Sequence, residues 1–415
     1  MFRVYLHSLG CRLNQSEIEA MARQLAARGC VLASDPAQAD VLVVNTCAVT
    51  AQAERKSRHL LRALHRANPT ARIAAVGCGV SFDLPGFAAL PGVVWAVPNA
   101  DKERLPELIA PGPASQREIQ PLRRTRALVK AQDGCDNRCT YCVVWRLRGP
   151  SRSRPLEAVV AEVEARLREG YQEVVLTGVN LGAYGRQVGM ERGLARLVAA
   201  LLQRTALPRL RLSSLEPWDV DESLFELWAD PRLCRQLHLP LQSGCDAVLR
   251  RMGRPITAER YARLAEAARA AIPDLALTAD VLVGFPGEDE AAFAESLAFV
   301  EAVGLARLHV FPFSPRPGTP AALMSDQVPE AERVERARRM RELGSRLAAS
   351  FRQRFVGREM AVLWERRRED GLWHGLTDNY LSVVTASDED LHNRIVPTRL
   401  LSADEGFMRG ETNRA

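Results

Sequence analysis

The segment RALVKAQDGCDNRCTYC, residues 126–142, joins a predicted strand to three cysteines on the loop that follows it. The strand RALVKAQ opens a region, reaching to about residue 320, in which strand patterns alternate with helix patterns. Six or so strands joined by helices predict a full or partial α/β barrel, whose reactive groups lie at the carboxyl ends of the strands. Cys135, Cys139 and Cys142 follow the first of these strands.

The spacing of these cysteines, C-x3-C-x2-C, indicates an iron–sulfur cluster. Zinc sites usually offer paired C-x2-C units and four ligands. A cubane is held by one thiolate per iron, so three thiolates leave the fourth iron open to a small molecule that binds through nitrogen and oxygen. The alternative is a set of three buried or zinc-bound cysteines.

A second set of cysteines belongs to the first 110 residues, where a βαβαβ pattern predicts a parallel sheet flanked by helices. Cys11, Cys47 and Cys78 each follow one of its strands, FRVYLHS, DVLVVNT and ARIAAVG. Loops after parallel strands open on one edge of the sheet, so we expect the three thiols to meet there. They would hold a second cubane with an open iron, and the alternative is that they are buried core cysteines.

The chain of 415 residues, 47% of them hydrophobic, is long enough for several domains with cores of their own. We expect an N-terminal parallel-sheet α/β domain over 1–116, the α/β barrel over 117–355 and a small all-β domain over 356–415. The segment PGPASQREIQP, 111–121, is a predicted linker, and a long helix is expected over 329–355.

Features of the whole chain indicate a cytoplasmic protein. It has no run of eighteen apolar residues, and its first residues lack the pattern of a signal peptide. Disulfides are rare in that reducing compartment, so the nine cysteines indicate metal or redox chemistry, or burial. Cys30 and Cys234 are interpreted as packing residues, and the role of Cys245 stays open.

Positive charge is concentrated around the triple cysteine. Residues 117–154 contain 10 basic and 3 acidic residues. This run predicts contact with a polyanion, and the alternative is a solvated basic linker.

Several motifs together resemble the radical S-adenosylmethionine (AdoMet) methylthiotransferases. They are SLGCRLNQSE, NTCAVTAQAERKSR, CDNRCTYC, TGVNLGAYG, RLSSLEP, HLPLQSGCDAVLRRMGR, DVLVGFPGE and FPFSPRPGTPA. The resemblance covers essentially the whole chain. It implies two 4Fe–4S clusters, a radical-AdoMet barrel and a C-terminal TRAM domain, which GLTDNYLSVV resembles. It further implies tRNA as substrate and a reducing system that supplies electrons, with no membrane.

The resemblance also suggests residues for AdoMet binding. Tyr141 is at the position of an aromatic side chain near adenine, and Ser213 and Glu216 suit hydrogen bonds to ribose. Asn180 and Gln242 also follow strands, and the glycines of VGFPGE let backbone approach adenine. For each residue, a purely structural role at a barrel end is the alternative. No catalytic residue is assigned beyond the cluster ligands.

The motif SLGCRLNQ is similar to the branch of the family that modifies N6-threonylcarbamoyladenosine (t6A) next to the tRNA anticodon. The branches that act on isopentenyladenosine in tRNA, or on an aspartate of a ribosomal protein, are the alternatives. A non-enzymatic iron–sulfur or RNA-binding module is a further one. The chain departs from the family pattern at GVS after Cys78 and in the net acidic charge of its TRAM-like segment. That segment contains aromatic and histidine side chains that could stack on bases or pack in a core, namely Trp364, Trp373, His374 and Tyr380.

Overall fold

The computed structural model describes residues 2–112 and 124–412, so most of the predicted linker 111–121 lies outside the described residues. Within that range the chain forms two compact units. One comprises the described residues of 1–122, 133–151 and 314–322, and the other comprises those of 123–132, 152–313 and 323–415. The loop with the three barrel cysteines therefore belongs to the first unit, whereas the strand before it belongs to the second.

The first unit is built on a parallel five-stranded sheet of order β2-β1-β3-β4-β5. Its strands are β1 (Arg3–Ser8), β2 (Val31–Leu32), β3 (Val41–Thr46), β4 (Arg72–Gly77) and β5 (Val93–Val97). Its helices are α1 (Arg12–Ala27), α2 (Ala51–Ala67), α3 (Cys78–Phe82), α4 (Leu84–Ala88), α5 (Leu105–Ile109) and α6 (Val144–Arg148). This confirms the parallel-sheet α/β prediction.

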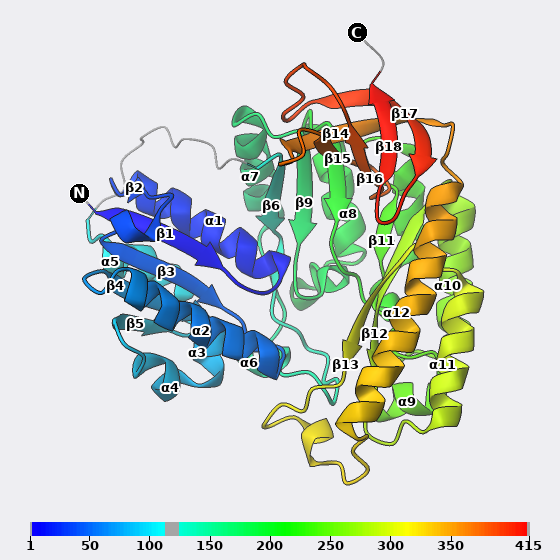
Figure 1. Ribbon diagram of the computed structural model, residues 1–415, viewed down its shortest axis with the longest axis horizontal. Helices are drawn as coiled ribbons and strands as arrows, with labels where there is room; N and C mark the ends of the chain where they lie inside the picture. The colour runs from blue at the N-terminus through cyan, green and yellow to red at the C-terminus, as the bar shows by residue number, and fades with distance from the viewer. Residues whose placement is uncertain (1, 113–123, 413–415) are drawn as a thin grey trace. The chain divides into compact units, whose positions relative to one another are not determined.

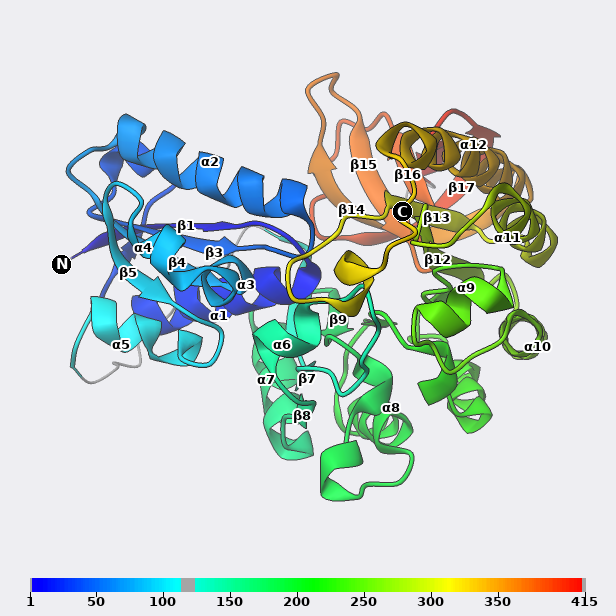
Figure 2. The same ribbon diagram turned by 90° about the horizontal axis from the view of Figure 1, so that it is seen from below.

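Alternate side chains of β3 and β4 enter two separate hydrophobic cores, one on each face of the sheet. Val43 and Val76 pack with residues of α1 and α5, whereas Val44 and Ala75 pack with residues of α2 and α4. Helices α1 and α2 consequently lie on opposite faces of the sheet (Figure 2).

The second unit contains six parallel strands in an open arc, which confirms the prediction of a partial barrel (Figure 1). The strands are β6 (Arg126–Lys130), β9 (Glu173–Thr177), β10 (Arg209–Leu212), β11 (Gln236–His238), β12 (Ala276–Val283) and β13 (Arg307–Pro312). Two isolated bridges, Leu210 to Leu233 and Ser214 to His238, join the halves β10-β9-β6 and β11-β12-β13.

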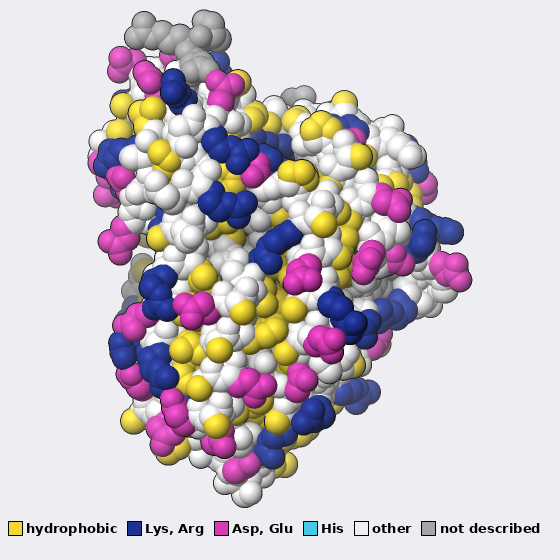
Figure 3. All heavy atoms as spheres, turned by 90° about the vertical axis from the view of Figure 1, so that its right-hand side faces the viewer, with side chains coloured by type: hydrophobic (Ala, Val, Ile, Leu, Met, Phe, Trp, Pro, Cys, Tyr) yellow, Lys and Arg dark blue, Asp and Glu magenta, His cyan; other side chains and the backbone are white. Residues whose placement is uncertain are grey.

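The helices of this unit are α7 (Leu156–Arg168), α8 (Gly193–Arg204), α9 (Asp246–Arg251), α10 (Ala258–Ala271), α11 (Glu290–Val303) and α12 (Glu330–Gln353). On the face that includes α11 and α12, acidic and basic side chains are interspersed (Figure 3). A search of the described helices finds no segment long and apolar enough to cross a membrane.

The C-terminal segment is a closed five-stranded barrel of order β14-β15-β16-β18-β17, as expected. Its strands are β14 (Glu359–Arg367), β15 (Trp373–Thr377), β16 (Ser382–Thr385), β17 (Ile395–Ala403) and β18 (Met408–Thr412). Trp364 and Trp373 are buried in its core, so they pack inside the barrel and are not free to stack on bases. The short pair β7 (Gln132–Asp133) and β8 (Arg152–Ser153) precedes and follows the cysteine loop in the chain.

Arginines at the amino ends of the α/β-barrel strands hold this C-terminal barrel. The Arg211 guanidinium donates to the backbone oxygen of Thr377 and pairs with Glu173, and both side chains are completely buried. Arg126 pairs with Glu365 at 2.7 Å. The carboxyl ends of the strands, where such folds place reactive groups, therefore lie away from these contacts.

Candidate metal centres and cofactor site

Three cysteines of the first unit lie at the carboxyl ends of β1, β3 and β4, which are hydrogen-bonded neighbours in the sheet. Cys11, Cys47 and Cys78 follow these strands within three residues. The loop of Cys11 approaches Cys47 closely, because a Cβ added to Gly10 (φ +98°) would lie 2.8 Å from the Cys47 Sγ. The structure thus brings this predicted set to one edge of the sheet.

The thiols of this edge share one local environment. Burial raises the pKa of Cys47 to about 11; a backbone hydrogen bond from Val49 opposes this shift, and the neighbouring Cys78 and Cys11 add to it. Cys11 is exposed as a residue, yet surrounding atoms desolvate its thiol and raise its pKa, while the positive charge of Arg148 acts in the opposite direction. Metal binding here must release protons, as it does for thiolate ligands in general.

The loop of Cys135, Cys139 and Cys142 is held by backbone contacts of its own. The Cys135 N–H donates to Gly149 O at 3.0 Å, and the Cys142 N–H donates to Cys139 O at 3.0 Å. Gly134 adopts φ +73°, and a Cβ there would lie 2.0 Å from Pro150 O, so only glycine fits. Tyr141 lies half-buried on this same loop.

Sequence reasoning missed a buried ionic network that joins the two cysteine regions within the first unit. The Arg148 Nη1 lies 2.8 Å from Glu17 Oε1 and 2.8 Å from Asp133 Oδ1. The Lys102 Nζ contacts the same two carboxylates, at 2.5 and 2.9 Å. Two cations thus balance two carboxylates, and all four residues are buried.

Two asparagines extend this network toward the thiols. The Asn14 Nδ2 donates to Leu9 O and to Thr46 O, the residue before Cys47, while its Oδ1 accepts from Arg148 at 2.6 Å. The Asn99 Nδ2 donates to the Cys78 Sγ at 3.3 Å and to Leu147 O. Asn14 and Glu17 belong to the motif GCRLNQSE around Cys11, which is the sequence feature that could have pointed to them.

The network changes the interpretation of the basic run 117–154. Arg148 is buried in the ionic network, and Arg126 pairs with Glu365, so neither side chain is available to a polyanion. Of the described arginines in the run, Arg154 also has a carboxylate partner, Glu162.

In the second unit, the residues suggested for AdoMet binding follow three successive strands. Asn180 follows β9, Ser213 and Glu216 follow β10, and Gln242 follows β11. Among the described residues, the Ser213 Oγ and the Asn180 Oδ1 are buried without a hydrogen-bond partner. Such orphaned atoms are costly in a folded protein and fit a polar ligand.

The other two residues of the set are held in defined positions. Glu216 accepts from the buried Arg254 at 2.8 Å; burial raises the pKa of Glu216, with Arg254 opposing the shift. Gln242 adopts φ +72°, which is unusual for a side chain of this size. Both fit a site whose geometry is fixed in advance.

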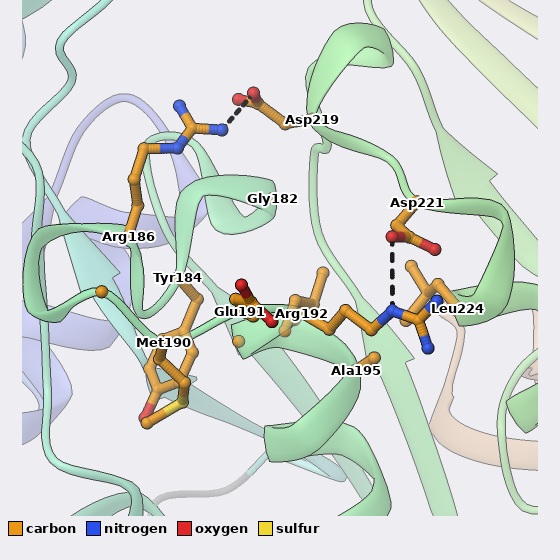
Figure 4. A pocket seen from close by; sticks show the side chains of 13 residues that line it. Gly182, Tyr184, Arg186, Met190, Glu191, Arg192, Ala195, Asp219, Asp221 and Leu224 are labelled. Atoms are coloured by element: carbon orange, nitrogen blue, oxygen red, sulfur yellow. Dashed lines mark hydrogen bonds and ion pairs between the residues drawn. The ribbon is translucent and has the colours of Figure 1, made fainter.

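A cleft of about 320 Å³ lies in the second unit, and Figure 4 shows the side chains that line it. It is lined in part by Arg186 and Arg192, which pair with Asp219 at 2.5 Å and with Asp221 at 3.6 Å. Asp219 also accepts from Asn180 Nδ2 at 2.6 Å. Both arginines of the cleft are therefore paired with carboxylates.

A second set that sequence reasoning missed comprises His238, Asp280 and His309 on β11, β12 and β13. The Asp280 Oδ1 lies 3.3 Å from His238 Nε2 and 3.2 Å from His309 Nδ1. Burial alone would raise the pKa of Asp280, but the two imidazoles outweigh it and hold that pKa below its usual range. Two histidines and one aspartate on three different strands give no local pattern in the sequence.

Comparisons with known proteins agree with this arrangement. The Radical SAM superfamily matches residues 129–300, and the Uncharacterized protein family UPF0004 matches residues 3–94. A solved radical AdoMet methyltransferase, TsrM from Kitasatospora setae, aligns with a TM-score of 0.60 and 16% identity over 77% of this chain and 75% of its own. The fold and the cysteine loop thus define a radical-AdoMet enzyme.

Curated relatives narrow the assignment. The threonylcarbamoyladenosine tRNA methylthiotransferase MtaB of Bacillus subtilis is 34% identical over 99% of this chain and 96% of its own length. MtaB of Thermotoga maritima is 36% identical, covering 92% and 91%. A tRNA-2-methylthio-N(6)-dimethylallyladenosine synthase of Novosphingobium aromaticivorans is 37% identical, covering 99% and 96%. The chain belongs to the radical-AdoMet methylthiotransferase family.

Proposed function

We propose that this enzyme transfers a methylthio group to C2 of N6-threonylcarbamoyladenosine, next to the anticodon of tRNA. The observation that carries the proposal is the presence of two separate three-cysteine sets in one chain, of which one follows three neighbouring strands and the other occupies a single loop. C2 of adenine carries hydrogen and no leaving group, so a radical route is needed to place sulfur there. Two of the MtaB relatives support the t6A substrate.

Each cysteine set fits a 4Fe–4S cluster, because three thiols can hold three irons and leave one open. Cys135, Cys139 and Cys142 would hold the cluster that reacts with AdoMet, and Cys11, Cys47 and Cys78 the auxiliary cluster. When bound and reduced by an external reducing system, the first cluster supplies a 5′-deoxyadenosyl radical from AdoMet.

The chain's own residues would bind and orient these groups. Ser213 and Asn180 offer buried oxygens without partners, which suit polar groups of AdoMet. Glu216, held by Arg254, and Gln242 would fix the ligand from neighbouring loops. Tyr141 would contribute an aromatic face from the cysteine loop. A tRNA substrate would place the reaction in the cytoplasm.

The dimethylallyl-type relatives make isopentenyladenosine in tRNA the second candidate substrate. The test is nucleoside analysis of two tRNA pools, one carrying t6A and one carrying isopentenyladenosine, after anaerobic incubation with reconstituted protein, AdoMet and reductant. We expect 2-methylthio-t6A from the first pool and no methylthio product from the second. If only the second pool gave a methylthio product, the substrate would be isopentenyladenosine and not t6A.

A further inference from the structure

The outward face of α2 carries a row of cations that have no partner among the described residues. The helix contains five basic residues and a single acidic one, Glu54, which pairs with Arg58 and Arg316. The exposed positively charged or titratable residues of the row are Arg55, Lys56, His59, Arg62 and Arg66. No ion pair or hydrogen bond joins their side chains to another described residue.

The row has a regular geometry. Arg55, Arg62 and Arg66 lie on one side of the helix, because steps of seven and four residues return to the same face. Eleven residues of helix rise by about 16 Å, which is longer than a single phosphate requires and suits a run of them. The opposite face of α2 is anchored in the core by Leu61 and Leu64.

The row leads to the auxiliary cysteines. A shallow surface hollow of about 580 Å³ is lined by side chains of α2 that include Arg55, Lys56 and Arg62. A pocket of about 280 Å³, lined in part by Gly10, Cys47 and Lys56, lies beside it. Lys56 and Gln52 border both hollows, so the basic surface of α2 adjoins the pocket next to Cys47.

Several exposed arginines elsewhere on the surface are paired with carboxylates. On α12, Arg338 pairs with Glu335 and Glu342, and Arg346 pairs with Glu301. Unpaired cations in a row therefore distinguish α2 from this helix. None of the exposed large hydrophobic residues among those described lies on α2, so the face lacks the apolar contacts of a protein or membrane interface.

We propose that the exposed row Arg55 to Arg66 of α2 binds the sugar–phosphate backbone of the RNA substrate and leads it to the pocket beside Cys47. This rests on the proposed function for the identity of the RNA. Charge complementarity and the absence of apolar residues favour a nucleic acid over an acidic protein or a lipid surface.

The test replaces Arg55, Arg62 and Arg66 together by Gln, which keeps the helix propensity and leaves Lys56 and the core in place. The matched control replaces Arg168, Arg196 and Arg260 by Gln, which removes the same charge from exposed positions of α7, α8 and α10. The probe is a labelled anticodon stem-loop RNA carrying t6A, titrated at several salt concentrations against reconstituted protein. Binding to vesicles containing phosphatidylserine is measured in parallel.

For the α2 variant we expect at least about tenfold weaker RNA binding near physiological salt, and a salt slope lower by about 2 to 3 units. AdoMet cleavage without RNA should be unchanged, and the control should bind like the wild type. Equal affinity and slope for variant and wild type, or equal losses in variant and control, would overturn this surface assignment. So would binding that is selective for vesicles. If the wild type binds RNA through α2 but forms no methylthio product, the proposed function fails while the surface stands.

Discussion

At the scale of single residues, Arg148 links more of the candidate site than any other side chain described above. It contacts Glu17 and Asp133, which lie 131 and 15 residues away in sequence, and it also reaches Asn14. Removing one member of a buried ionic group leaves the others uncompensated and costs about 3–5 kcal/mol. Its position between the two cysteine regions makes it a positioning residue for both.

We expect Arg148→Gln to lower the thermal stability of the iron-free protein and to reduce the iron bound by both cysteine sets after reconstitution. The control is Arg104→Gln, because Arg104 is exposed on the same unit and pairs with Asp101 only at 3.8 Å. Differential scanning fluorimetry and iron analysis provide the two readouts. Unchanged melting together with full iron content would show that the network does not position the loops.

A second prediction at this scale concerns Ser213. Its buried hydroxyl oxygen has no partner among the described residues, so Ser213→Ala should leave the stability of the ligand-free protein unchanged or slightly raised. AdoMet binding should weaken by about tenfold, the value of one hydrogen bond of about 1.4 kcal/mol. Calorimetric titration measures the affinity, and Ser223→Ala, at a serine outside the set suggested for AdoMet binding, is the control. Equal affinities of Ser213→Ala and wild type would remove Ser213 from the site.

The candidate cysteines could be predicted from the sequence, but the buried residues that hold their loops could not, for a physical reason. Each cysteine follows a strand, and the topology of a parallel sheet alone predicts where strand ends meet. Lys102 and Glu17, by contrast, are 85 residues apart and pair only through tertiary packing. A buried ionic network has no spacing rule, so its members resemble ordinary charged residues in a sequence.

At the scale of elements, α1 illustrates the same limit. The apolar pattern of SEIEAMARQLAARG, residues 16–29, predicts a helix that starts at residue 16, but α1 begins at Arg12, with Cys11 as its N-cap residue. The added first turn holds Asn14, whose side chain turns inward to the backbone of neighbouring loops. Buried polar residues interrupt the hydrophobic periodicity, so this turn was not recognised.

The loop from Gly284 to Glu288, between β12 and α11, gives a pH-dependent prediction. Burial raises the pKa of Glu288 to about 6, with the Gly284 N–H and Arg336 opposing the shift. The folded chain thus keeps a proton that the unfolded chain releases near its ordinary pKa of 4.5. Its stability should therefore fall as the pH rises through this window, by about 2 kcal/mol for this group.

Glu288→Gln has no proton to release, so the difference in unfolding free energy between wild type and variant should change across pH 4.5 to 6 and level off above it. Denaturant unfolding of iron-free proteins at several pH values measures this difference. A difference that stays constant from pH 4 to pH 7 would contradict the raised pKa.

At the scale of the whole molecule, the predicted fold classes of the three parts are confirmed. One set of three cysteines lies at a sheet edge, and the other lies on one loop. The domain limits 1–116, 117–355 and 356–415 stay predictions. The two compact units do not follow these limits, since the cysteine loop groups with the first unit. Strand alternation identifies each fold, but the sequence pattern does not show which unit a loop packs against.

The two cysteine sets are expected to have different chemical roles, and one reaction tests this division. Well-folded Cys47→Ala and Cys139→Ala proteins are incubated anaerobically with AdoMet, reductant and tRNA carrying t6A, and 5′-deoxyadenosine and 2-methylthio-t6A are quantified together by mass spectrometry. Circular dichroism checks that each variant has kept its fold, since loss of a cluster can unfold a domain. We expect Cys47→Ala to form 5′-deoxyadenosine but no methylthio product, and Cys139→Ala to form neither. Methylthio product from a folded Cys47→Ala protein would contradict the account and return Cys11, Cys47 and Cys78 to the role of buried core cysteines.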